Sequence, residues 1–572
     1  MKPLVVLALR ILPLPVLALT LAAASCGSSK VTVLTPPDAG STGSGGHAAT
    51  SGGAGTGGGA GTGGASGGAC PAYQSLCNGA CIPTSTDPNN CGGCGVKCTG
   101  TLACSGGACA ADCLPGLDAC AGSCVDRQSD NKNCGTCGNV CPTGKGCVKG
   151  GCETAVAVGP GPTTCAGGGP PIVIAANQGG CLGQLAQTTF RWGLCSCKDV
   201  RASDKLLVDA YDSRAGLYHP GGLGGGVGAN GGYATSASVE IWGTLWCSAT
   251  TGVDTHASNT IKQELRVGGT LHSSDTFTVG DDAYVAGDVS TSASITIGKT
   301  LHTPAASTVS DKVTYGTLTR EAVTVPPPCD CQPQQLIPIV DIVAAHRAPN
   351  NDDALLNLDP AVFATTGAPH RLDLPCGNYY LTKIDQSQGL TIAAHGRTAL
   401  YIDGDVHNSD ALTFALDPGA ELDIFIAGTI VSSDKLTIGS PSYPALSRTY
   451  VGSPNGLSLS AGSRIGGNLY AAYGLVSWSA GSDLYGSIYA GDFTASASTV
   501  IHYDRAVLGT GDVCMPPANP PPDAGVPGCG SCKDCGNQAC INGTCGACRT
   551  SADCCAPLVC GVDGRCIANV IP

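Results

Sequence analysis

The chain has 572 residues, among them 84 glycines and 36 cysteines, and only 12% are charged and 5% aromatic. This length allows several domains, and this composition is typical of turns, short strands and flexible tethers rather than of a helical enzyme. The formal net charge of -13 argues against binding to nucleic acid and against electrostatic attachment to anionic lipid headgroups.

The chain begins like a secretory signal peptide, which we place at residues 1–25. Basic Lys2 opens the segment, an apolar stretch follows, and small residues precede Cys26. The sequence Ala23-Ala24-Ser25-Cys26 resembles a bacterial lipobox, and this resemblance implies that Cys26 is lipidated and anchors the mature chain. It also implies the outer membrane, because Gly27 stands where inner-membrane lipoproteins commonly carry aspartate. An ordinary cleaved signal peptide is the alternative.

Residues 26–69 continue as the lipidated cysteine and a Gly/Ser/Thr-rich tether that has almost nothing to bury. A flexible linker of this length spans roughly 35–40 Å on average, which is enough to hold a folded part away from a lipid surface. Export also predicts that the cysteines pair as disulfides, because compartments outside the cytoplasm are oxidising.

Two cysteine-rich repeats are expected at residues 70–109 and 113–152. The second set of cysteines follows the first at a constant offset of 43 positions, so every spacing is preserved. A unit this small and this poor in apolar residues needs covalent or metal staples. The cysteines are Cys70, Cys77, Cys81, Cys91, Cys94, Cys98, Cys104 and Cys109, then Cys113, Cys120, Cys124, Cys134, Cys137, Cys141, Cys147 and Cys152.

Metal binding and disulfide bonding are the two interpretations of these repeats. Cys134, Cys137 and Cys141 have the spacing of a ferredoxin motif, but Asn131 stands where that motif needs a further cysteine. Zinc would favour two C-x2-C arms, and each repeat offers one. We therefore expect four disulfides in each repeat, and the sequence leaves their pairing open.

The strings "CNGACIPTSTDPNNCGGCGVKC" and "CAGSCVDRQSDNKNCGTCGNVC" resemble the Stig1-type cysteine-rich repeat of secreted plant proteins and bacterial surface proteins. The resemblance implies an extracellular disulfide module and no reaction.

A parallel β-solenoid is expected over residues 154–513, with an insertion near 325–375. Here a motif of glycine, one polar residue and one aliphatic residue recurs, with a repeat of about 20 residues. We expect each glycine to permit the backbone angles of a corner, and each aliphatic side chain to stack on its equivalent in the next coil. A β-sandwich is the alternative fold. The motif glycines are Gly243, Gly269, Gly287, Gly404, Gly428, Gly467 and Gly486.

The region 170–510 also resembles a known domain, through "LPCGNYYL", "GNLYAAYGLVSWSAG", "LYGSIYAGDF" and "IHYDRAVL", with "DAYDSRAGLY" as its opening. That domain has no characterised function and occurs in bacterial surface lipoproteins and in pilus-assembly proteins of the PilX type. The resemblance implies a β-helical surface domain without an assigned reaction.

Two close cysteine pairs, Cys195/Cys197 and Cys329/Cys331, flank the first half of the predicted solenoid. After export we expect disulfides that fasten a loop or cap, rather than a zinc site of four thiolates. Residues 338–358 carry helix-like sequence and are interpreted as the insertion between two solenoid halves.

A proline-rich linker is expected at 514–528 and a cysteine-rich module at 529–566. The string "CRTSADCCAPLVCGVDGRC" resembles small secreted knottin-like modules, and the ten cysteines suffice for five disulfides. With Cys26 lipidated, an odd number of cysteines remains, which predicts a free thiol at Cys247 or Cys514. The module's cysteines are Cys529, Cys532, Cys535, Cys540, Cys545, Cys548, Cys554, Cys555, Cys560 and Cys566.

Catalytic motifs are missing from the sequence. It has no H-E-x-x-H and no phosphate-binding G-x-x-x-x-G-K-[ST], and the G-x-S-x-G at Gly64–Gly68 lies in the tether. The glycine-rich stretch 221–232 is expected to be a loop. His502, Tyr503 and Asp504 are expected to cap the last coil rather than to form a site.

Three histidines and a set of aromatic residues are the remaining binding candidates. His272, His302 and His407 are expected to be weakly buried or surface side chains, with a stacked-histidine metal site as the alternative. Trp478, Tyr470, Tyr485 and Tyr489 would form a row for stacking on sugar rings, or rungs of core and surface aromatics, which we favour. No placement makes the acidic pairs Asp281/Asp282, Asp352/Asp353 and Asp403/Asp405 converge, as a polysaccharide-cleaving site would need.

The sequence therefore predicts a non-enzymatic lipoprotein of the cell outer membrane, facing the surface or the periplasm, with a structural, display or adhesion role. We expect no cofactor, no metal site and no catalytic residue. The expected partners are the membrane, through the lipid anchor, and surface polysaccharide or other surface proteins. A polysaccharide-binding or polysaccharide-cleaving β-helix and a pilus- or secretion-associated assembly component are the alternatives.

Overall fold

The computed structural model describes Cys70, residues 73–162, Ala186 and residues 189–510, with the exception of residues 366, 368, 460 and 461. It also describes four tail strands. The signal peptide at 1–25, Cys26, the tether at 26–69, the linker at 514–528 and the disulfides expected within 529–566 lie outside the described residues. Among the described residues, no helix is long and apolar enough to cross a membrane.

The two cysteine-rich repeats are built from short antiparallel strand pairs held by disulfides. The bonds of the first repeat are Cys70–Cys81, Cys77–Cys94, Cys91–Cys104 and Cys98–Cys109. Those of the second are Cys113–Cys124, Cys120–Cys137, Cys134–Cys147 and Cys141–Cys152, which is the same pattern. The strands are β1 (Ser75–Cys77), β2 (Ala80–Ile82), β3 (Ala103–Ser105), β4 (Ala108–Ala110), β5 (Asp118–Cys120), β6 (Ser123–Val125), β7 (Lys145–Val148) and β8 (Gly151–Thr154).

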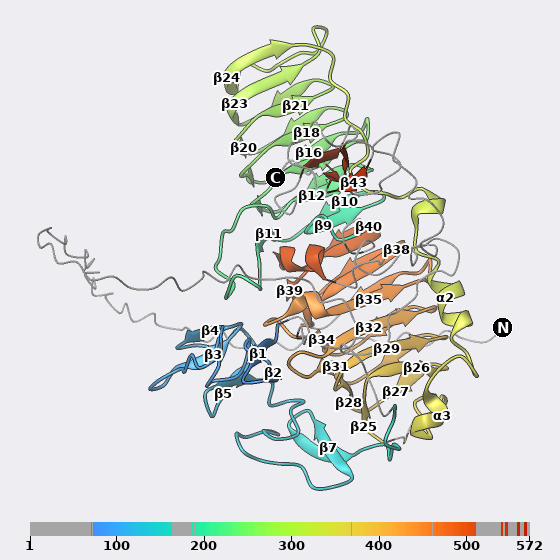
Figure 1. Cartoon of the computed structure of the whole chain (residues 1–572). Coiled ribbons are helices and arrows are strands. Elements are labelled where there is room, and N and C mark those ends of the chain that lie inside the picture. The colour runs from blue at the N-terminus through green and yellow to red at the C-terminus, as the bar shows by residue number, and fades with distance from the viewer. Residues whose placement is uncertain are drawn as a thin grey trace, which may run out of the picture. The chain divides into compact units, whose positions relative to one another are not determined.

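The centre of the protein is one parallel β-sheet of 33 strands wound into a solenoid (Figure 1). Most strands pair with the strand three places later, so a coil has three strands and three faces. The fold class is thus a mainly β protein with a parallel β-solenoid and an N-terminal disulfide-rich module, as predicted, and the β-sandwich alternative is wrong.

The solenoid has two segments. The upper segment comprises β9 (Leu194–Ser196), β10 (Val200–Ala202), β11 (Leu206–Tyr211), β12 (Val227–Ala229), β13 (Tyr233–Thr235), β14 (Val239–Ile241), β15 (Leu245–Cys247), β16 (Val253–Thr255), β17 (Asn259–Ile261), β18 (Leu265–Val267), β19 (Leu271–Ser273), β20 (Phe277–Val279), β21 (Ala283–Val285), β22 (Val289–Thr291), β23 (Ile295–Thr303) and β24 (Val313–Arg320). The lower segment comprises β25 (Arg371–Leu374), β26 (Gly377–Leu381), β27 (Ile384–Gln386), β28 (Leu390–Ala394), β29 (Arg397–Ile402), β30 (Val406–Asn408), β31 (Leu412–Leu416), β32 (Glu421–Ile426), β33 (Ile430–Ser432), β34 (Leu436–Gly439), β35 (Ser447–Val451), β36 (Leu457–Leu459), β37 (Arg464–Gly466), β38 (Asn468–Trp478), β39 (Ser482–Tyr485), β40 (Ile488–Ala495) and β41 (Thr499–Asp504), with 3-10 turns η3 (Pro444–Leu446) and η4 (Arg505–Gly509).

The two segments stack in an order that differs from the order of the chain. Strands β9, β10 and β11 pair with β12, β13 and β14 on one side, and with β40 and β41 on the other. The last coil of the lower segment therefore lies directly against the first coil of the upper segment. We call this contact the joint. The sequence predicted one solenoid with an insertion, and it did not predict this non-sequential order.

The chain returns from the top of the upper segment to the bottom of the lower one through η2 (Pro333–Gln335), α2 (Ile339–Ala345) and α3 (Asp353–Leu356). This is the helix-containing insertion expected near 325–375. At the bottom, Leu356 and Phe363 are fully buried in the solenoid core, and the side chain of Gln386 donates to the carbonyl oxygen of Phe363 over 2.9 Å. Residues after α3 thereby cover the lower end of the core.

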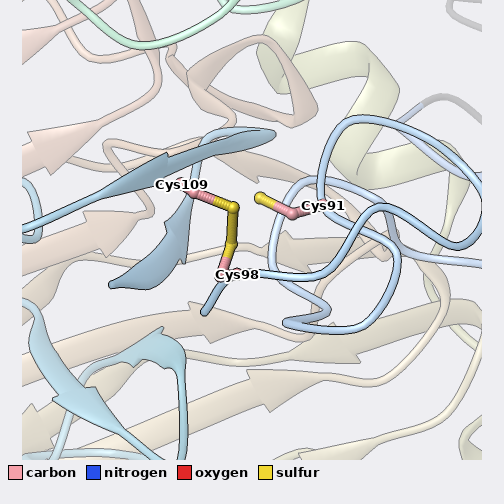
Figure 2. A group of neighbouring side chains, drawn as sticks. All are labelled: Cys91, Cys98 and Cys109. Atoms are coloured by element: carbon pink, nitrogen blue, oxygen red, sulfur yellow. A yellow bond between two sulfur atoms is a disulfide. The ribbon is translucent and has the colours of Figure 1, made fainter. Parts of the chain in front are cut away.

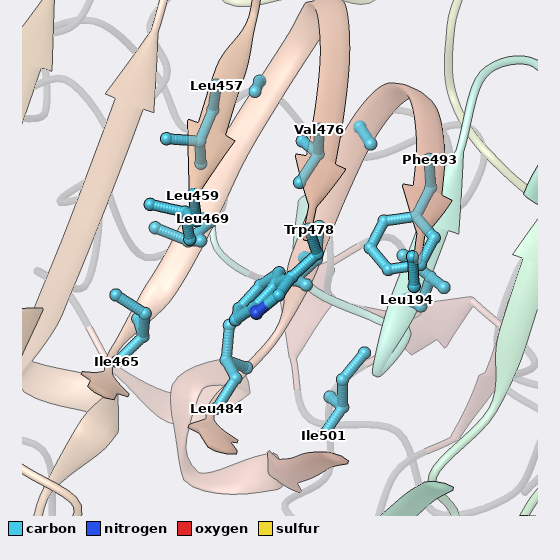
Figure 3. Close-up of a cluster of buried hydrophobic side chains, with 14 of the residues drawn as sticks. Leu194, Leu457, Leu459, Ile465, Leu469, Val476, Trp478, Leu484, Phe493 and Ile501 are labelled. Atoms are coloured by element: carbon cyan, nitrogen blue, oxygen red, sulfur yellow. The ribbon is translucent and has the colours of Figure 1, made fainter. Parts of the chain in front are cut away.

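The solenoid interior is filled by aliphatic and aromatic side chains stacked coil on coil (Figure 3). The aliphatic residue of every predicted Gly-x-aliphatic motif is buried, and Leu271 stacks on Val289 and Val406 on Ile430. Coil length differs between the segments: Leu245 pairs with Leu265, whereas Ile430 pairs with Leu457. The predicted repeat of about 20 residues thus describes the upper coils from β12 onward, whereas the length of a coil varies along the lower segment.

The explanation given above for the motif glycines is wrong at most positions. Among the seven, only Gly486 has a positive φ, at 139°. The others face the backbone of the preceding coil: a Cβ on Gly243 would lie 2.5 Å from the carbonyl carbon of Gly225, and one on Gly269 would lie 2.0 Å from the carbonyl oxygen of Thr250. Glycine is required because neighbouring coils approach too closely for a side chain, rather than because of the backbone angles.

Gly428→Ala tests this requirement. The added Cβ would lie 2.5 Å from the backbone of Gly404, so we expect a loss of about 1–3 kcal/mol in the free energy of unfolding. Gly481→Ala is the matched control, because the nearest atom to its added Cβ, the carbonyl oxygen of Ser498, is 3.8 Å away. Chemical denaturation followed by circular dichroism measures both, and equal effects of the two substitutions would contradict the explanation.

Candidate functional site

The aromatic row proposed for sugar stacking is buried. Trp478 is fully enclosed in the solenoid core (Figure 3), and Tyr470, Tyr485 and Tyr489 are each at most 3% exposed. The interpretation as a sugar-binding row is therefore wrong for these residues, and the alternative, rungs of packed aromatics, is confirmed. Stacking on a sugar needs an open ring face, which none of the four offers.

Two of these tyrosines belong to a column that contributes one residue per coil along the whole solenoid. The register of the sheet continues the column across the joint. Neighbouring rings stack: the Phe425 and Tyr450 ring centroids are 4.6 Å apart, and those of Tyr284 and His302 are 4.3 Å apart. The column comprises Tyr380, Tyr401, Phe425, Tyr450, Tyr470, Tyr489, Cys195, Gly228, Trp246, Arg266, Tyr284, His302 and Thr319.

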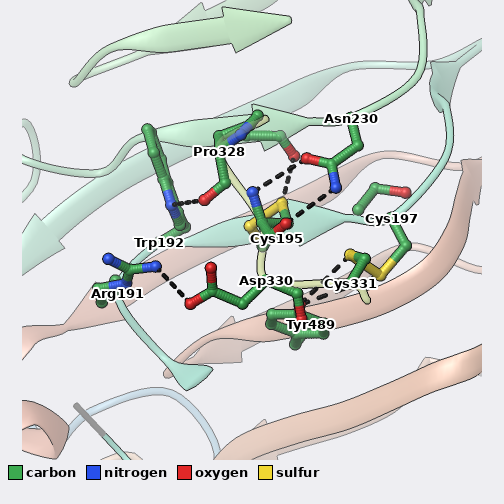
Figure 4. Close-up of a disulfide and its surroundings, with 12 residues drawn as sticks. Arg191, Trp192, Cys195, Cys197, Asn230, Pro328, Asp330, Cys331 and Tyr489 are labelled. Atoms are coloured by element: carbon green, nitrogen blue, oxygen red, sulfur yellow. Dashed lines mark hydrogen bonds and ion pairs between the residues drawn. A yellow bond between two sulfur atoms is a disulfide. The ribbon is translucent and has the colours of Figure 1, made fainter. Parts of the chain in front are cut away.

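Residues 326–347, which we call the strap, run along this column and are bonded to it at the joint. Disulfides join Cys195 in β9 to Cys329, and Cys197, just after β9, to Cys331, and both fix the strap to this coil (Figure 4). The hydroxyl of Tyr489 donates to the carbonyl oxygen of Asp330 over 2.7 Å. The two C-x-C pairs are therefore disulfide-bonded to each other and fasten a long connection, so no thiolate remains there for zinc.

The lower half of the strap packs on the aromatic residues of the lower segment. Helix α2 buries Ile339, Ile342 and Val343 in one cluster with the column tyrosines. The ring of His346 stacks on Tyr401 with centroids 3.8 Å apart, and burial lowers the pKa of His346, which favours the neutral ring. The strap thus completes a second, outer core along this face.

A polar network crosses the joint and includes the predicted trio. Asp209 accepts hydrogen bonds from the hydroxyl of Tyr218 over 2.7 Å and from the backbone N–H of Gly221, and its other oxygen lies 2.8 Å from Nδ1 of His502. Asp504 accepts from the backbone N–H and the hydroxyl of Ser213, over 2.9 and 2.6 Å. The interpretation of the trio as an end cap is wrong, because β41 pairs with β11, so the trio lies at the joint between the two segments and not at an end of the solenoid.

The joint network lacks the geometry of a nucleophilic site. The hydroxyl of Ser213 donates to Asp504 and not to His502, whereas an activated serine needs a base at its own oxygen. The ring of His502 packs between Tyr218 and Tyr485, with centroids 4.1 and 4.6 Å away. Burial raises the pKa of Asp504 to about 6. The network binds the two segments together.

The predicted histidines do not form a ladder. His272 lies opposite Ser290, His302 opposite Tyr284 and His407 opposite Asp385 in the sheet register. Each ring is half-buried or exposed and has a local partner, such as the Glu321 carboxylate 2.6 Å from Nδ1 of His302. The interpretation as weakly buried or surface side chains is confirmed for the three.

The acidic pairs also do not converge on one site, because their carboxylates bind different neighbouring groups. Asp281 forms an ion pair with Lys299 over 2.7 Å, and Asp403 forms one with Arg347 in the strap over 2.6 Å. Asp353 accepts the backbone N–H of Tyr380, and burial raises its pKa to about 6. Sequence reasoning missed the fully buried ion pair of Arg448 with Asp423, 2.6 Å apart, which only the sheet register brings together.

Three sulfur atoms approach one another in each cysteine-rich repeat, as they would around a metal ion. In the first repeat they belong to Cys91, Cys98 and Cys109 (Figure 2). Cys98 and Cys109 are bonded to each other and Cys91 is bonded to Cys104, so the group holds neighbouring disulfides and no thiolate.

Cys247 is the free cysteine among the described residues, in agreement with the parity argument, whereas its alternative, Cys514, lies outside them. Its thiol lies in the core, 3.0 Å from the carbonyl oxygen of Gly231, and burial raises its pKa to about 11. Such a thiol stays protonated and is a packing residue rather than a nucleophile.

The stretch 221–232, expected to be a loop, contains the short strand β12.

Removal of both strap disulfides tests whether they hold the strap against the solenoid. Each closes a loop with a sequence separation of 134, for which a chain-entropy account gives a stabilisation of about 4–5 kcal/mol. We expect the quadruple variant Cys195→Ser/Cys197→Ser/Cys329→Ser/Cys331→Ser to keep its β-rich circular dichroism but to be cut by protease within 326–347 and to bind a hydrophobic dye. Cys197→Ser/Cys331→Ser, which keeps one bond, is the control. Equal protease resistance of all three proteins would show that packing alone holds the strap.

Asp504→Asn tests the joint network. The pKa of Asp504 is about 6 in the folded protein against 3.8 for an ordinary aspartate, so its ionisation between pH 3.8 and about 6 weakens the fold. The free energy of unfolding should fall by about 3 kcal/mol as pH rises through this window. Asparagine keeps an acceptor oxygen and can donate to Ser213, so the variant should lose this part of the pH dependence. Urea denaturation of both proteins across the window measures it, and parallel curves would contradict the assignment.

Comparison with known proteins gives two partial matches. Residues 341–510 match a family described as Domain of unknown function (DUF7305), and residues 105–155 match the stigma-specific STIG1-like protein family. The first match begins within α2 and ends after β41, and therefore covers the end of the strap and the lower segment. No curated protein and no solved structure matches the chain. The chain thus contains a Stig1-like repeat and a β-solenoid domain of unknown function.

Proposed function

We propose that this protein is a non-enzymatic surface lipoprotein that acts as a rigid spacer for display or adhesion. In this proposal the signal peptide at 1–25 directs export and the lipidated Cys26 anchors the chain in the outer membrane. The tether then separates the folded part from the lipid, and the solenoid presents surfaces to other cells, proteins or polysaccharide.

The strap is the observation that carries the proposal. It covers the aromatic column and is fixed by two disulfides to the coil at which the two solenoid segments meet. A disulfide-held cover over a packed outer core limits movement of the coils and protects the backbone from protease, which suits a load-bearing element outside the cell. The disulfide-bonded repeats suit the same environment.

Two other functions remain as outcomes of experiment. A polysaccharide-cleaving β-helix would release reducing sugar, and a chelator or an acidic-residue substitution would abolish that release. A pilus- or secretion-associated component, suggested by the resemblance to PilX-type proteins, would co-purify with pilin-like subunits. Either result obtained with the full-length protein would replace the spacer proposal.

Cys26→Ser tests the anchor. Without the thiol no lipid can be attached, so we expect the variant to leave the membrane fraction and to appear in the periplasm or medium, whereas the wild-type protein partitions into detergent. Cys247→Ser is the matched control, because it removes a buried cysteine that the proposal does not use.

The orientation of the solenoid is read from the same cells. An epitope tag inserted in the exposed loop at residues 305–306 should be accessible to antibody on intact cells carrying the wild-type chain. Membrane retention of the Cys26→Ser protein would contradict lipid anchoring, and a tag detected only after permeabilisation would contradict surface display.

A further inference from the structure

The two ends of the solenoid differ in whether other residues cover them. The lower end is covered by residues that follow α3, including the fully buried Phe363. At the upper end, β24 pairs with β23 on one side, and no strand of the described chain pairs with its other side. Its residues Thr314–Thr317 are exposed. The tip therefore presents an edge with free backbone N–H and C=O groups, which proteins normally cover or interrupt.

Apolar side chains of the core are also partly exposed at this tip. In the sheet register Tyr315 lies over Ile297 and Leu318 lies over Leu301, and both lower residues are buried. Tyr315 and Leu318 thus occupy core positions of a coil on whose upper edge no described strand lies. Tyr315 is 38% exposed and Leu318 is only partly buried. A further layer on the tip would bury both side chains.

We propose that a second copy of this chain covers the tip, with the two β24 strands paired antiparallel about a two-fold axis near Gly316. Turning one coil over reverses its direction, so two identical tips can meet face to face only with antiparallel strands. The corner at Gly316 then lies near the axis, and the strand before it meets the strand after it in the partner.

One pairing register of the two β24 strands places core positions opposite core positions. Directly opposed residues of an antiparallel pair point to the same side of the sheet, so core positions must oppose core positions. This is met when Tyr315 lies opposite the partner's Leu318. Val313 then lies opposite the partner's Arg320, an exposed residue whose guanidinium donates to the carbonyl oxygens of Pro304 and Ser307 in its own chain. A shift by one residue would turn the core positions of one copy toward the outside of the other.

The same register brings opposite charges together. It places Lys312, whose Nζ donates to the carbonyl oxygen of Ser292 over 2.7 Å, opposite the partner's Glu321, whose carboxylate lies 2.6 Å from Nδ1 of His302 in the same copy. The two-fold axis repeats this pair on the other side. A shift by two residues, which would also keep the faces matched, places Lys312 opposite Thr319 or Val323 of the partner and loses both pairs. Core matching and charge complementarity therefore select one arrangement, and this is why a second copy fits the tip better than an unrelated strand.

Charge reversal tests this arrangement in the full chain carrying Cys26→Ser, which is free of lipid. Sedimentation velocity over a concentration series should show a reversible monomer–dimer equilibrium for this parent protein. Lys312→Glu and Glu321→Lys should each raise the dissociation constant by about tenfold or more, because each sets two like-charged pairs against each other. The double variant Lys312→Glu/Glu321→Lys restores opposite charges and should dimerise like the parent.

Two further variants keep the test independent of folding. Lys262→Glu breaks an ion pair of 3.0 Å with Glu240 on the side of the same segment, and it should leave dimerisation unchanged. Leu318→Lys should abolish dimerisation while thermal unfolding confirms a folded monomer. A parent protein that stays monomeric at all concentrations, or a double variant no better than its single variants, would overturn the proposal, as would dimers equally insensitive to both charge reversals.

Discussion

Parallel pairing between β11 and β41 is the contact on which the rest of the structure depends. Six residues of each strand, Leu206–Tyr211 and Thr499–Asp504, are in register although they lie far apart in the sequence. The pairing satisfies the backbone groups of two strand edges, and it lets the stacked aliphatic core continue from the lower to the upper segment. The buried carboxylates of Asp209 and Asp504 are bound from both segments, so they tie together the same two coils.

The strap extends this joint along the outside of the solenoid. The chain leaves the joint coil after Tyr211 and returns to the same level at Cys329, where the disulfide to Cys195 closes the excursion. Everything between these points, the upper coils included, is an extension built on the joint. The match to the domain of unknown function starts only after the extension, at residue 341, and covers the base on which it stands.

Sequence reasoning predicted the fold class and the inward aliphatic residues, because both follow from local periodicity. It was wrong about the motif glycines, since close approach of one coil to the next is invisible in a single repeat. It also could not place His502 and Asp504 at a joint, because their partners Asp209 and Ser213 lie in another segment and the stacking order is not sequential. The burial of Tyr470 and Tyr489 depends on the strap, whose course no local pattern encodes.

The non-sequential stacking also affects how the protein is made. A chain synthesised from its N-terminus delivers β9–β11 first, and the upper coils can form on them at once, because the partner strands β12–β14 follow next in the sequence. The opposite edge of β9–β11 must wait for residues up to Asp504, with His502 meeting Asp209 across a separation of 293 positions. Until then this edge is open to pairing with other nascent chains, so completion of the C-terminal coils ends the interval of greatest risk of misassembly.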